Sequence, residues 1–338
     1  MRVTVTGAAG FIGRCTCQAL HDWGHEPVAF VQIEDSRAQF LRDQGWGVEV
    51  VGDLARHQHL SALLAGVECV VHLAGRAHIL SETHGNPLSA FREVNRDGTL
   101  HLARAAVDAS VRRIVFISSI GVNGNKTTQT PFSEALAPVP HDPYALSKFE
   151  AEMGLREMAA HSTMDFVILR PPLVYGPGAP GNFGRLMALI SRGWPLPFGS
   201  IDNRRSLLYL GNLVDAIHLC LTHPWAANKT YLLSDGEDVS TPELVRRLAQ
   251  AMGQPARLLP VPPRLLELTA HLVGKGQEVQ RLLDSLAVDS GKIRRELGWQ
   301  PPYSMEEGLA ETAAWYRASL KSLASSKLRV GEQVGHPD

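Results

Sequence analysis

The chain has 338 residues, 44% of them apolar and 20% charged, so it can bury a sizeable core and is not of the composition typical of disordered proteins. Its 33 basic and 34 acidic side chains leave a formal charge of −1, and its arginine pairs are dispersed, which argues against a nucleic-acid partner. The start of the chain lacks the features of a secretion signal, and no apolar run approaches the roughly 20 residues that span a bilayer, so a cytoplasmic protein without a membrane span is expected.

Short, nearly continuous apolar runs alternate with helical patterns along the first half of the chain. The first run, residues 2–6, stops at Gly7, and a helical pattern follows from Phe11 to about Trp23. Further runs fall at 27–32, 48–53, 68–75, 112–119 and 165–171. Because their apolarity is continuous, these strands are expected to be buried on both faces of a parallel sheet. The pattern predicts an α/β fold with a Rossmann-type doubly wound parallel sheet over residues 1–169, with ligands at the carboxyl ends of its strands.

The composition changes after residue 169. Proline and glycine are dense between residues 170 and 200, which is typical of a cleft wall and a hinge. A helix is expected at 240–253, with a Ser or Thr cap, Pro242 in its first turn and Gly253 as its stop. We therefore expect a smaller C-terminal α/β substrate lobe over 170–318, with some segments returning to the Rossmann core, and a flexible tail over 319–338.

The sequence "TGAAGFIG" (6–13) places three glycines directly after the first strand and at the start of the first helix. Gly7 allows a tight turn, Gly10 lets the backbone approach a pyrophosphate, and Gly13 lets helix and strand pack closely. In this position the GxxGxxG spacing favours dinucleotide binding over a purely structural turn.

The sequence "DPYALSK" (142–148) spaces a tyrosine and a lysine by four, so that Tyr144 and Lys148 share one helix face. Alone, this spacing fits a solvated helix surface. After a glycine loop, and with Ser119 at the end of the preceding strand, it favours a catalytic group. Lys148 is expected to lower the pKa of Tyr144, Tyr144 to accept a proton from a substrate hydroxyl, and Ser119 to position that hydroxyl.

These motifs together resemble the extended short-chain dehydrogenase/reductase family over about residues 1–318. "GDL" (52–54), "HLAG" (72–75), "VNRDGT" (94–99), "FISS" (116–119), "YALSK" (144–148) and "RPPLVYGPG" (170–178) follow in the family's order. The resemblance implies Ser119 as the catalytic hydroxyl, five residues before Gly124, with Ser118 as the alternative. It also implies a cofactor site formed by Gly7, Gly10, Phe11, Ile12, Gly13, Asp53, Leu54, Leu73, Ala74, Gly75, Asn95, Tyr144, Lys148 and Pro171.

The expected cofactor is NAD, with NADP left open. The end of the second strand carries Val31 and Gln32, where an acidic residue would bind the adenosine ribose of NAD. Arg37 could meet a 2′-phosphate, whereas Glu34 or Asp35 could reach the ribose.

The resemblance also narrows the reaction. The family's 4,6-dehydratases carry an Asp-Glu pair directly after the catalytic hydroxyl, where this chain has Ile120 and Gly121, so elimination is disfavoured. Arg205 matches a phosphate-binding arginine, whose fork suits a diphosphate. Asn182 matches a second phosphate contact, although a turn asparagine fits nearly as well.

Three departures bear on the sugar. Asn123 and Ser206 replace a tyrosine and an aspartate of the family and weaken a plain UDP-galactose 4-epimerase assignment. The family's tyrosine gate against a 2-N-acetyl group falls near Ser285 or Leu286, neither of which is aromatic. The pattern is closer to enzymes of bacterial polysaccharide synthesis that act on UDP-N-acetylhexosamines.

We therefore expect an NAD(P)-dependent 4-epimerase of a nucleotide-activated hexose, with UDP-GlcNAc and UDP-GalNAc as its substrates and a transient 4-keto intermediate. The nearest alternative is an NAD(P)H-dependent 4-ketoreductase of a UDP-2-acetamido-2,6-dideoxy-4-hexulose. A non-catalytic dinucleotide-sensing protein is a third hypothesis, disfavoured because a binder has no need of a proton acceptor. The resemblance implies a homodimer, and no metal site is expected, since histidines and cysteines lack ligand spacing.

Overall fold

The computed structural model describes residues 1–77, 86–272, 274 and 276–333. The chain divides into two compact units. The first comprises Met1–Val174, Ser206–Asp238 and Ser285–Pro302, and the second comprises Tyr175–Arg205, Val239–Asp284 and Tyr303–Asp338. Two segments that follow residue 175 in the sequence thus belong to the N-terminal unit.

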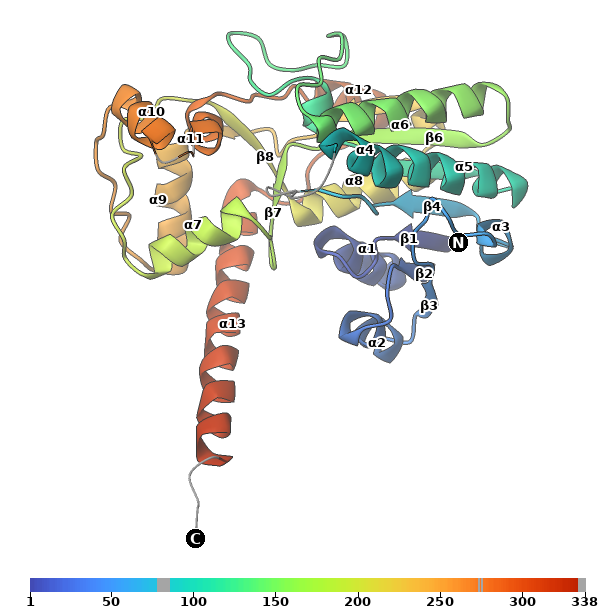
Figure 1. Ribbon diagram of the computed structural model, residues 1–338, viewed down its shortest axis with the longest axis horizontal. Helices are drawn as coiled ribbons and strands as arrows, with labels where there is room; N and C mark the ends of the chain where they lie inside the picture. Colours follow the sequence, from blue (N-terminus) through green and yellow to red (C-terminus); the bar gives the residue numbers. More distant parts are fainter. Residues whose placement is uncertain (78–85, 273, 275, 334–338) are drawn as a thin grey trace. The chain divides into compact units, whose positions relative to one another are not determined.

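The first unit is built on a seven-stranded sheet in the order β3-β2-β1-β4-β5-β6-β9 (Figure 1). Every pair of neighbouring strands is parallel. The order reverses between β1 and β4, and a doubly wound sheet binds its ligand beyond the carboxyl ends of the strands at such a point. The prediction of a Rossmann-type α/β fold is confirmed. The strands are β1 (Arg2–Thr6), β2 (Glu26–Val31), β3 (Gly47–Val50), β4 (Cys69–His72), β5 (Arg113–Ile117), β6 (Asp165–Arg170) and β9 (Lys229–Leu232).

Two apolar clusters hold the helices on the two faces of this sheet. One cluster joins Val5 and Val71 to Leu20 of α1 (Phe11–Asp22) and Ile217 of α8 (Leu210–Thr222). The other joins the opposite sides of β2, β4, β5 and β6 to α5 (Gly98–Asp108) and α6 (Pro143–Ala160). β4 and β5 are buried along their whole length, as continuous apolar runs predict. The remaining helices of this unit are α2 (Ser36–Asp43), α3 (Leu60–Leu63), α4 (Pro87–Arg92) and α12 (Gly291–Leu297), with short turns η1 (Glu93–Asp97), η2 (Ile120–Val122) and η3 (Pro224–Ala226).

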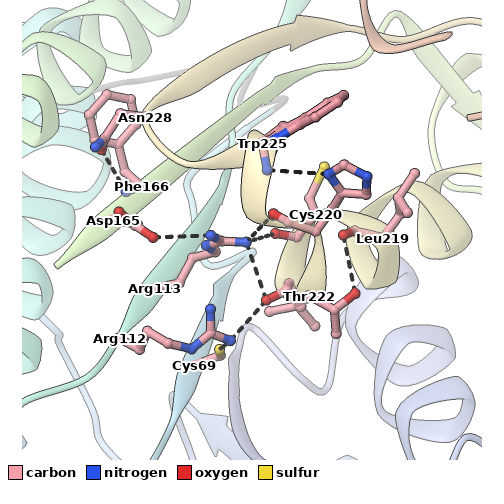
Figure 2. A network of polar contacts seen from close by, with 12 residues as sticks. Cys69, Arg112, Arg113, Asp165, Phe166, Leu219, Cys220, Thr222, Trp225 and Asn228 are labelled. Atoms are coloured by element: carbon pink, nitrogen blue, oxygen red, sulfur yellow. Dashed lines mark hydrogen bonds and ion pairs between the residues drawn. The ribbon is translucent and has the colours of Figure 1, made fainter. Parts of the chain in front are cut away.

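A buried arginine ties α8 to the sheet at the amino ends of β5 and β6 (Figure 2). Arg113 is 2% exposed and donates to Asp165 at 3.0 Å. It also donates to the carbonyl oxygens of Cys220 and His223, both at 2.9 Å, at the C-terminus of α8. A cation is favourable there because it satisfies the last carbonyl groups of the helix. The carboxyl ends of the strands, where doubly wound sheets bind their ligands, lie at the opposite edge of the sheet.

The second unit is mainly helical in its described residues. Its helices are α7 (Asn182–Ser191), α9 (Thr241–Met252), α10 (Pro263–Leu272), α11 (Gly276–Leu283) and α13 (Met305–Gln333). The helix expected at 240–253 is α9: the Ser240 hydroxyl accepts from the N–H of Glu243, and Gly253 ends the helix in the left-handed conformation. The chain also forms a three-stranded sheet in the order β10-β8-β7, from β10 (Asp238–Val239), β8 (Arg205–Tyr209) and β7 (Leu173–Tyr175). Most residues of β7 and β8 belong to the first unit.

The segment expected to be a flexible tail overlaps the end of α13, which runs to Gln333. Residues 334–338 of that expectation lie outside the described residues.

Candidate active site

The glycine loop joins β1 to α1 with little free space. Gly7 has φ +66°, and a side chain there would lie 2.9 Å from the backbone nitrogen of Ala74. A Cβ at Gly13 would overlap the Gly7 carbonyl oxygen and lie 2.7 Å from Ala8 Cα. Gly10 is the N-cap of α1 and supplies no side-chain acceptor, so within this fully described stretch the first turn, from Phe11, has no side-chain cap. An uncapped helix N-terminus behind a close glycine turn is suited to bind a phosphate.

The neighbouring loop 73–75 is held against the glycine loop by a chain of buried hydrogen bonds. Thr6 Oγ1 accepts from the N–H groups of Leu73 at 3.2 Å and Ala74 at 3.1 Å, so it donates its own proton to His72 Nδ1 at 2.6 Å. His72 Nε2 then donates to Thr99 Oγ1 at 2.8 Å, and Thr99 donates to the Asn95 carbonyl oxygen at 2.6 Å. His72 is therefore a neutral imidazole, and burial together with the charge of Lys148 lowers its pKa to about 3.

Asn95 lies in the π-helical turn η1 and fixes the next part of the wall. Its side chain accepts from the N–H of Arg76 at 2.8 Å and donates to Ser147 Oγ at 3.0 Å. A Cβ added at Gly75 would lie 3.2 Å from both Asn95 Oδ1 and Lys148 Nζ. The glycine thus lets three elements converge, and single π-turns of this kind are common at functional sites.

Ser119, Tyr144 and Lys148 come together where β5 ends and α6 begins. Ser119 follows β5, and its Oγ accepts from the N–H of Gly121 at 3.1 Å and is hydrogen-bonded to the Tyr144 hydroxyl. Tyr144 lies in the first turn of α6, which Asp142 caps by accepting from the N–H of Ala145 at 2.7 Å. Lys148 Nζ is buried and donates to the Ile117 carbonyl oxygen at 3.0 Å.

The electrostatics of these groups differ from the expectation. Burial raises the pKa of Tyr144 to about 12, opposed by its hydrogen bond to Ser119. Burial lowers the pKa of Lys148 to about 8, opposed by the charge of Glu152. The expectation that Lys148 lowers the pKa of Tyr144 is wrong for this structure, because the ammonium is directed to Ile117 O and the ring of Phe116, 4.6 Å away, and desolvation dominates at the phenol.

Ser118, the alternative catalytic hydroxyl, points away from this group. It is 4% exposed, and its Oγ donates to Glu152 at 2.6 Å. Asn123, one of the departures from the family's sequence, accepts from Arg170 at 2.9 Å. Both residues belong to a buried polar cluster behind the site that sequence reasoning did not identify.

The remaining residues predicted for the cofactor lie on the loops that follow the strands. Asp53, after β3, accepts from the N–H of Ala55 at 3.0 Å, and Leu54 lies beside Gly98 of α5. Pro171, after β6, accepts through its carbonyl oxygen from the N–H of Ile120 at 3.0 Å. Arg37, in the first turn of α2, forms an ion pair with Asp35 at 2.6 Å.

The two predicted phosphate-binding residues belong to the second unit. Asn182 is the first residue of α7 and is exposed. Arg205 donates to the carbonyl oxygens of Arg281 and, at 3.3 Å, Asp284, and burial lowers its pKa. The residues predicted as a sugar gate are backbone partners in the first unit: Ser285 O accepts from Thr127 N and Leu286 O from Ser206 N.

In the part of the chain that the structure describes, no helix is both long and apolar enough to cross a membrane. No group of three or more histidine, cysteine, aspartate or glutamate side chains in the same residues could hold a metal ion.

A glycine loop on a doubly wound sheet, with serine, tyrosine and lysine side chains meeting at the carboxyl end of β5, is typical of dinucleotide-dependent enzymes. Residues 3–233 match the family described as NAD dependent epimerase/dehydratase family. The chain belongs to this family, and the predicted resemblance is confirmed.

Full-length relatives support the same membership. The chain is 43% identical over 313 residues to a UDP-glucose 4-epimerase of Vibrio cholerae, covering 92% of this chain and 94% of that protein. It is 27% identical over 328 residues to the N-acetyl-alpha-D-glucosaminyl-diphospho-ditrans,octacis-undecaprenol 4-epimerase of Escherichia coli O157:H7, covering 92% and 93%. Among solved structures, MoeE5 in complex with UDP-glucose and NAD is 26% identical, with a TM-score of 0.75 over 95% of this chain and 100% of that one.

Proposed function

We propose that this enzyme is an NAD-dependent 4-epimerase of UDP-hexoses. The observation that carries the proposal is that Ser119, Tyr144 and Lys148 lie close together, beside the glycine loop and the uncapped N-terminus of α1. The 43% identity to a UDP-glucose 4-epimerase over nearly both full lengths supports 4-epimerisation over other reactions of the family.

The residues present fit NAD. A side chain at Gly7 or Gly13 would meet backbone atoms, so these glycines let the loop turn tightly onto the start of α1, whose first turn offers its N–H groups to a pyrophosphate. When bound there, NAD supplies the acceptor that takes a hydride from sugar C4 and gives it back. Arg37 is already paired with Asp35, so a 2′-phosphate would compete with a carboxylate for it, which favours NAD over NADP.

The side chains would divide the proton chemistry as follows. Tyr144 takes the proton of the C4 hydroxyl as the hydride leaves the same carbon, and returns it when the ketone is reduced from the other face. Ser119, already hydrogen-bonded to the phenol, holds the C4 oxygen between its own hydroxyl and that of Tyr144. Burial and the charge of Asp142 raise the pKa of Tyr144, so a phenolate there needs a positive charge nearby. We propose Lys148 for this role, one helical turn further on the same face, although in this structure its ammonium is directed to the Ile117 carbonyl oxygen.

Elimination of water is disfavoured because the two residues after Ser119 cannot transfer protons. Ile120 is 6% exposed and apolar, and Gly121 has no side chain. The family's dehydratases place carboxyl groups at these positions, so redox at C4 without loss of a hydroxyl remains.

For the sugar, we propose UDP-GlcNAc and UDP-GalNAc as the preferred pair. The support is the absence of an aromatic side chain at Ser285 and Leu286, which leaves space for a 2-N-acetyl group. Arg205 and Asn182 are proposed to bind the diphosphate. The alternative is UDP-glucose and UDP-galactose, in line with the substrate printed for the relative from Vibrio cholerae.

The test is an incubation of the purified protein with UDP-GlcNAc or UDP-glucose, without added cofactor, followed by proton NMR of the anomeric signals. We expect the 4-epimer of each sugar to appear, with the larger kcat/KM for UDP-GlcNAc. A larger kcat/KM for UDP-glucose would overturn the N-acetyl preference. No epimer from either, with stoichiometric oxidation of NAD(P)H when a UDP-4-keto-6-deoxy sugar is supplied, would replace the epimerase by the 4-ketoreductase.

A further inference from the structure

A polar cluster lies directly behind the catalytic side chains, in the core of the first unit. Its members are Glu152 of α6, Arg170 of β6, Ser118 after β5 and Asn123 after η2, each at most 4% exposed. Glu152 accepts from Arg170 Nε at 2.9 Å and Nη2 at 2.5 Å, and from Ser118 Oγ at 2.6 Å. Arg170 Nη1 donates to Asn123 Oδ1 at 2.9 Å, and Asn123 donates to the Ser133 carbonyl oxygen at 3.2 Å.

The members of this cluster adjoin the residues of the proposed site in the chain. Ser118 precedes Ser119, and Arg170 precedes Pro171. Glu152 lies one helical turn after Lys148 on the same face of α6. The bidentate ion pair therefore joins α6, which carries Tyr144 and Lys148, to the carboxyl ends of β5 and β6. A bidentate arginine–carboxylate pair fixes direction as well as distance.

The cluster also places one carboxylate beside a buried ammonium. Among the residues that the structure describes, the titratable groups around Lys148 are Tyr144 and Glu152 on its own helix, His72 on β4, and Arg170 on β6 beyond Glu152. His72 is neutral in its hydrogen-bond chain, and Tyr144 is protonated before it acts. Among these groups Glu152 is the only anion, and its charge opposes the effect of burial on Lys148.

We propose that Glu152 is a positioning residue of the reaction: its carboxylate, fixed by Arg170 and Ser118, keeps Lys148 as an ammonium ion and holds α6 in register with the ends of β5 and β6. The inference rests on the proposed function for its kinetic consequence only. Its electrostatic consequence concerns Lys148 itself and can be measured without turnover.

The experiment titrates Lys148 by NMR of nitrogen-15 labelled lysine side chains in the full chain. The protein has seven lysines, and the loss of one signal in Lys148→Arg assigns the one in question. In Glu152→Gln, which keeps the shape and removes the charge, we expect Lys148 to titrate about one pH unit lower than in the wild type. The alkaline limb of the pH profile of kcat/KM for epimerisation should move to lower pH by the same amount. Glu152→Asp, which keeps the charge, should return both the Lys148 titration and the alkaline limb to their wild-type positions.

Asp165→Asn is the matched control, because Asp165 pairs with buried Arg113 at the opposite end of β6 (Figure 2). It should lower the melting temperature and leave both the Lys148 titration and the alkaline limb where they were. If Glu152→Gln behaves in the same way as this control, the cluster is structural only and the proposal is overturned.

Glu152→Gln leaves the Arg170 charge without its partner, which can prevent folding. The double variant Glu152→Gln/Arg170→Gln removes both charges, and it should still lower the Lys148 titration, since Glu152 is the charge that acts on Lys148. An unchanged titration in the folded double variant overturns the proposal. Should the wild type epimerise no UDP-sugar, the proposed function fails while the lysine titration still decides this inference.

Discussion

Replacement of Tyr144 by phenylalanine separates the chemistry of the proposed site from its packing. The substitution removes one hydroxyl and its hydrogen bond to Ser119, and it keeps the ring that meets Phe91 edge-on at a centroid distance of 6.0 Å. Loss of one such hydrogen bond costs about 1 kcal/mol of folding free energy. Loss of a general base typically lowers the rate by about 10²- to 10⁴-fold, which corresponds to about 3 to 5.5 kcal/mol in the activation barrier.

The assay compares turnover of the UDP-sugar with urea unfolding for Tyr144→Phe and a matched control, Tyr231→Phe. Tyr231 is fully buried in β9, and its hydroxyl donates to Glu296 at 2.9 Å. A hydrogen bond to a charged group is worth about 1.5 to 3 kcal/mol, so the control should lose more stability than Tyr144→Phe and keep its turnover. Tyr144→Phe with more than about a tenth of wild-type turnover would refute the assignment of Tyr144 as proton acceptor.

Three further predictions concern the cofactor loop, the buried histidine and the sugar. Gly13→Ala places a methyl group 2.7 Å from Ala8 Cα, so it should lower the free energy of unfolding in urea by about 1 to 3 kcal/mol and cause the protein to lose NAD. In the control Gly47→Ala the nearest atom to the new methyl group is 3.9 Å away, and NAD should be retained. Equal NAD content in the two variants would argue against the glycine loop as the NAD site. The pKa of His72 falls from 6.5 to about 3 on folding, so protonation of this side chain favours the unfolded state once the pH drops below about 6.5. Between about pH 7 and pH 5, His72 should therefore lower the free energy of unfolding by about 2 kcal/mol. In His72→Gln this contribution to the pH dependence should be absent. Leu286→Tyr should reduce turnover of UDP-GlcNAc by about tenfold or more and leave turnover of UDP-glucose unchanged. An equal loss of turnover with both sugars would show that residue 286 does not select the substrate.

The parts of the fold that the sequence predicts are those with local signals. Continuous apolar runs identified the buried strands, and Ser240 with Gly253 marked α9. The glycine loop was predicted because its spacing reflects a local steric requirement at Gly7 and Gly13. Ser119 was placed correctly after β5, and its contact with Tyr144 was expected from the motif order.

The parts that escaped prediction depend on contacts between distant segments. The hydrogen-bond chain through His72 joins residues 6, 72, 95 and 99, none of which carries a signal for the others. In the sequence, Asn123 was only a departure from the family's pattern and Ser118 only the alternative catalytic hydroxyl. In the structure both are hydrogen-bonded within the cluster of Arg170 and Glu152. The pKa of Tyr144 was wrongly expected to fall, because the spacing of Lys148 shows a neighbouring charge and does not show the direction of its ammonium or the loss of water around the phenol.

The central claim is that a hydride leaves C4 of the sugar and returns to the same carbon within one closed site. The most direct measurement follows UDP-GlcNAc deuterated at C4 through epimerisation in ordinary water, with UDP-glucose treated in the same way. The account predicts that the 4-epimer retains the deuterium at C4, since the hydride is never exposed to solvent, and that no NAD(P)H is consumed. Replacement of the deuterium by solvent hydrogen would show a proton transfer at carbon instead and would contradict the mechanism.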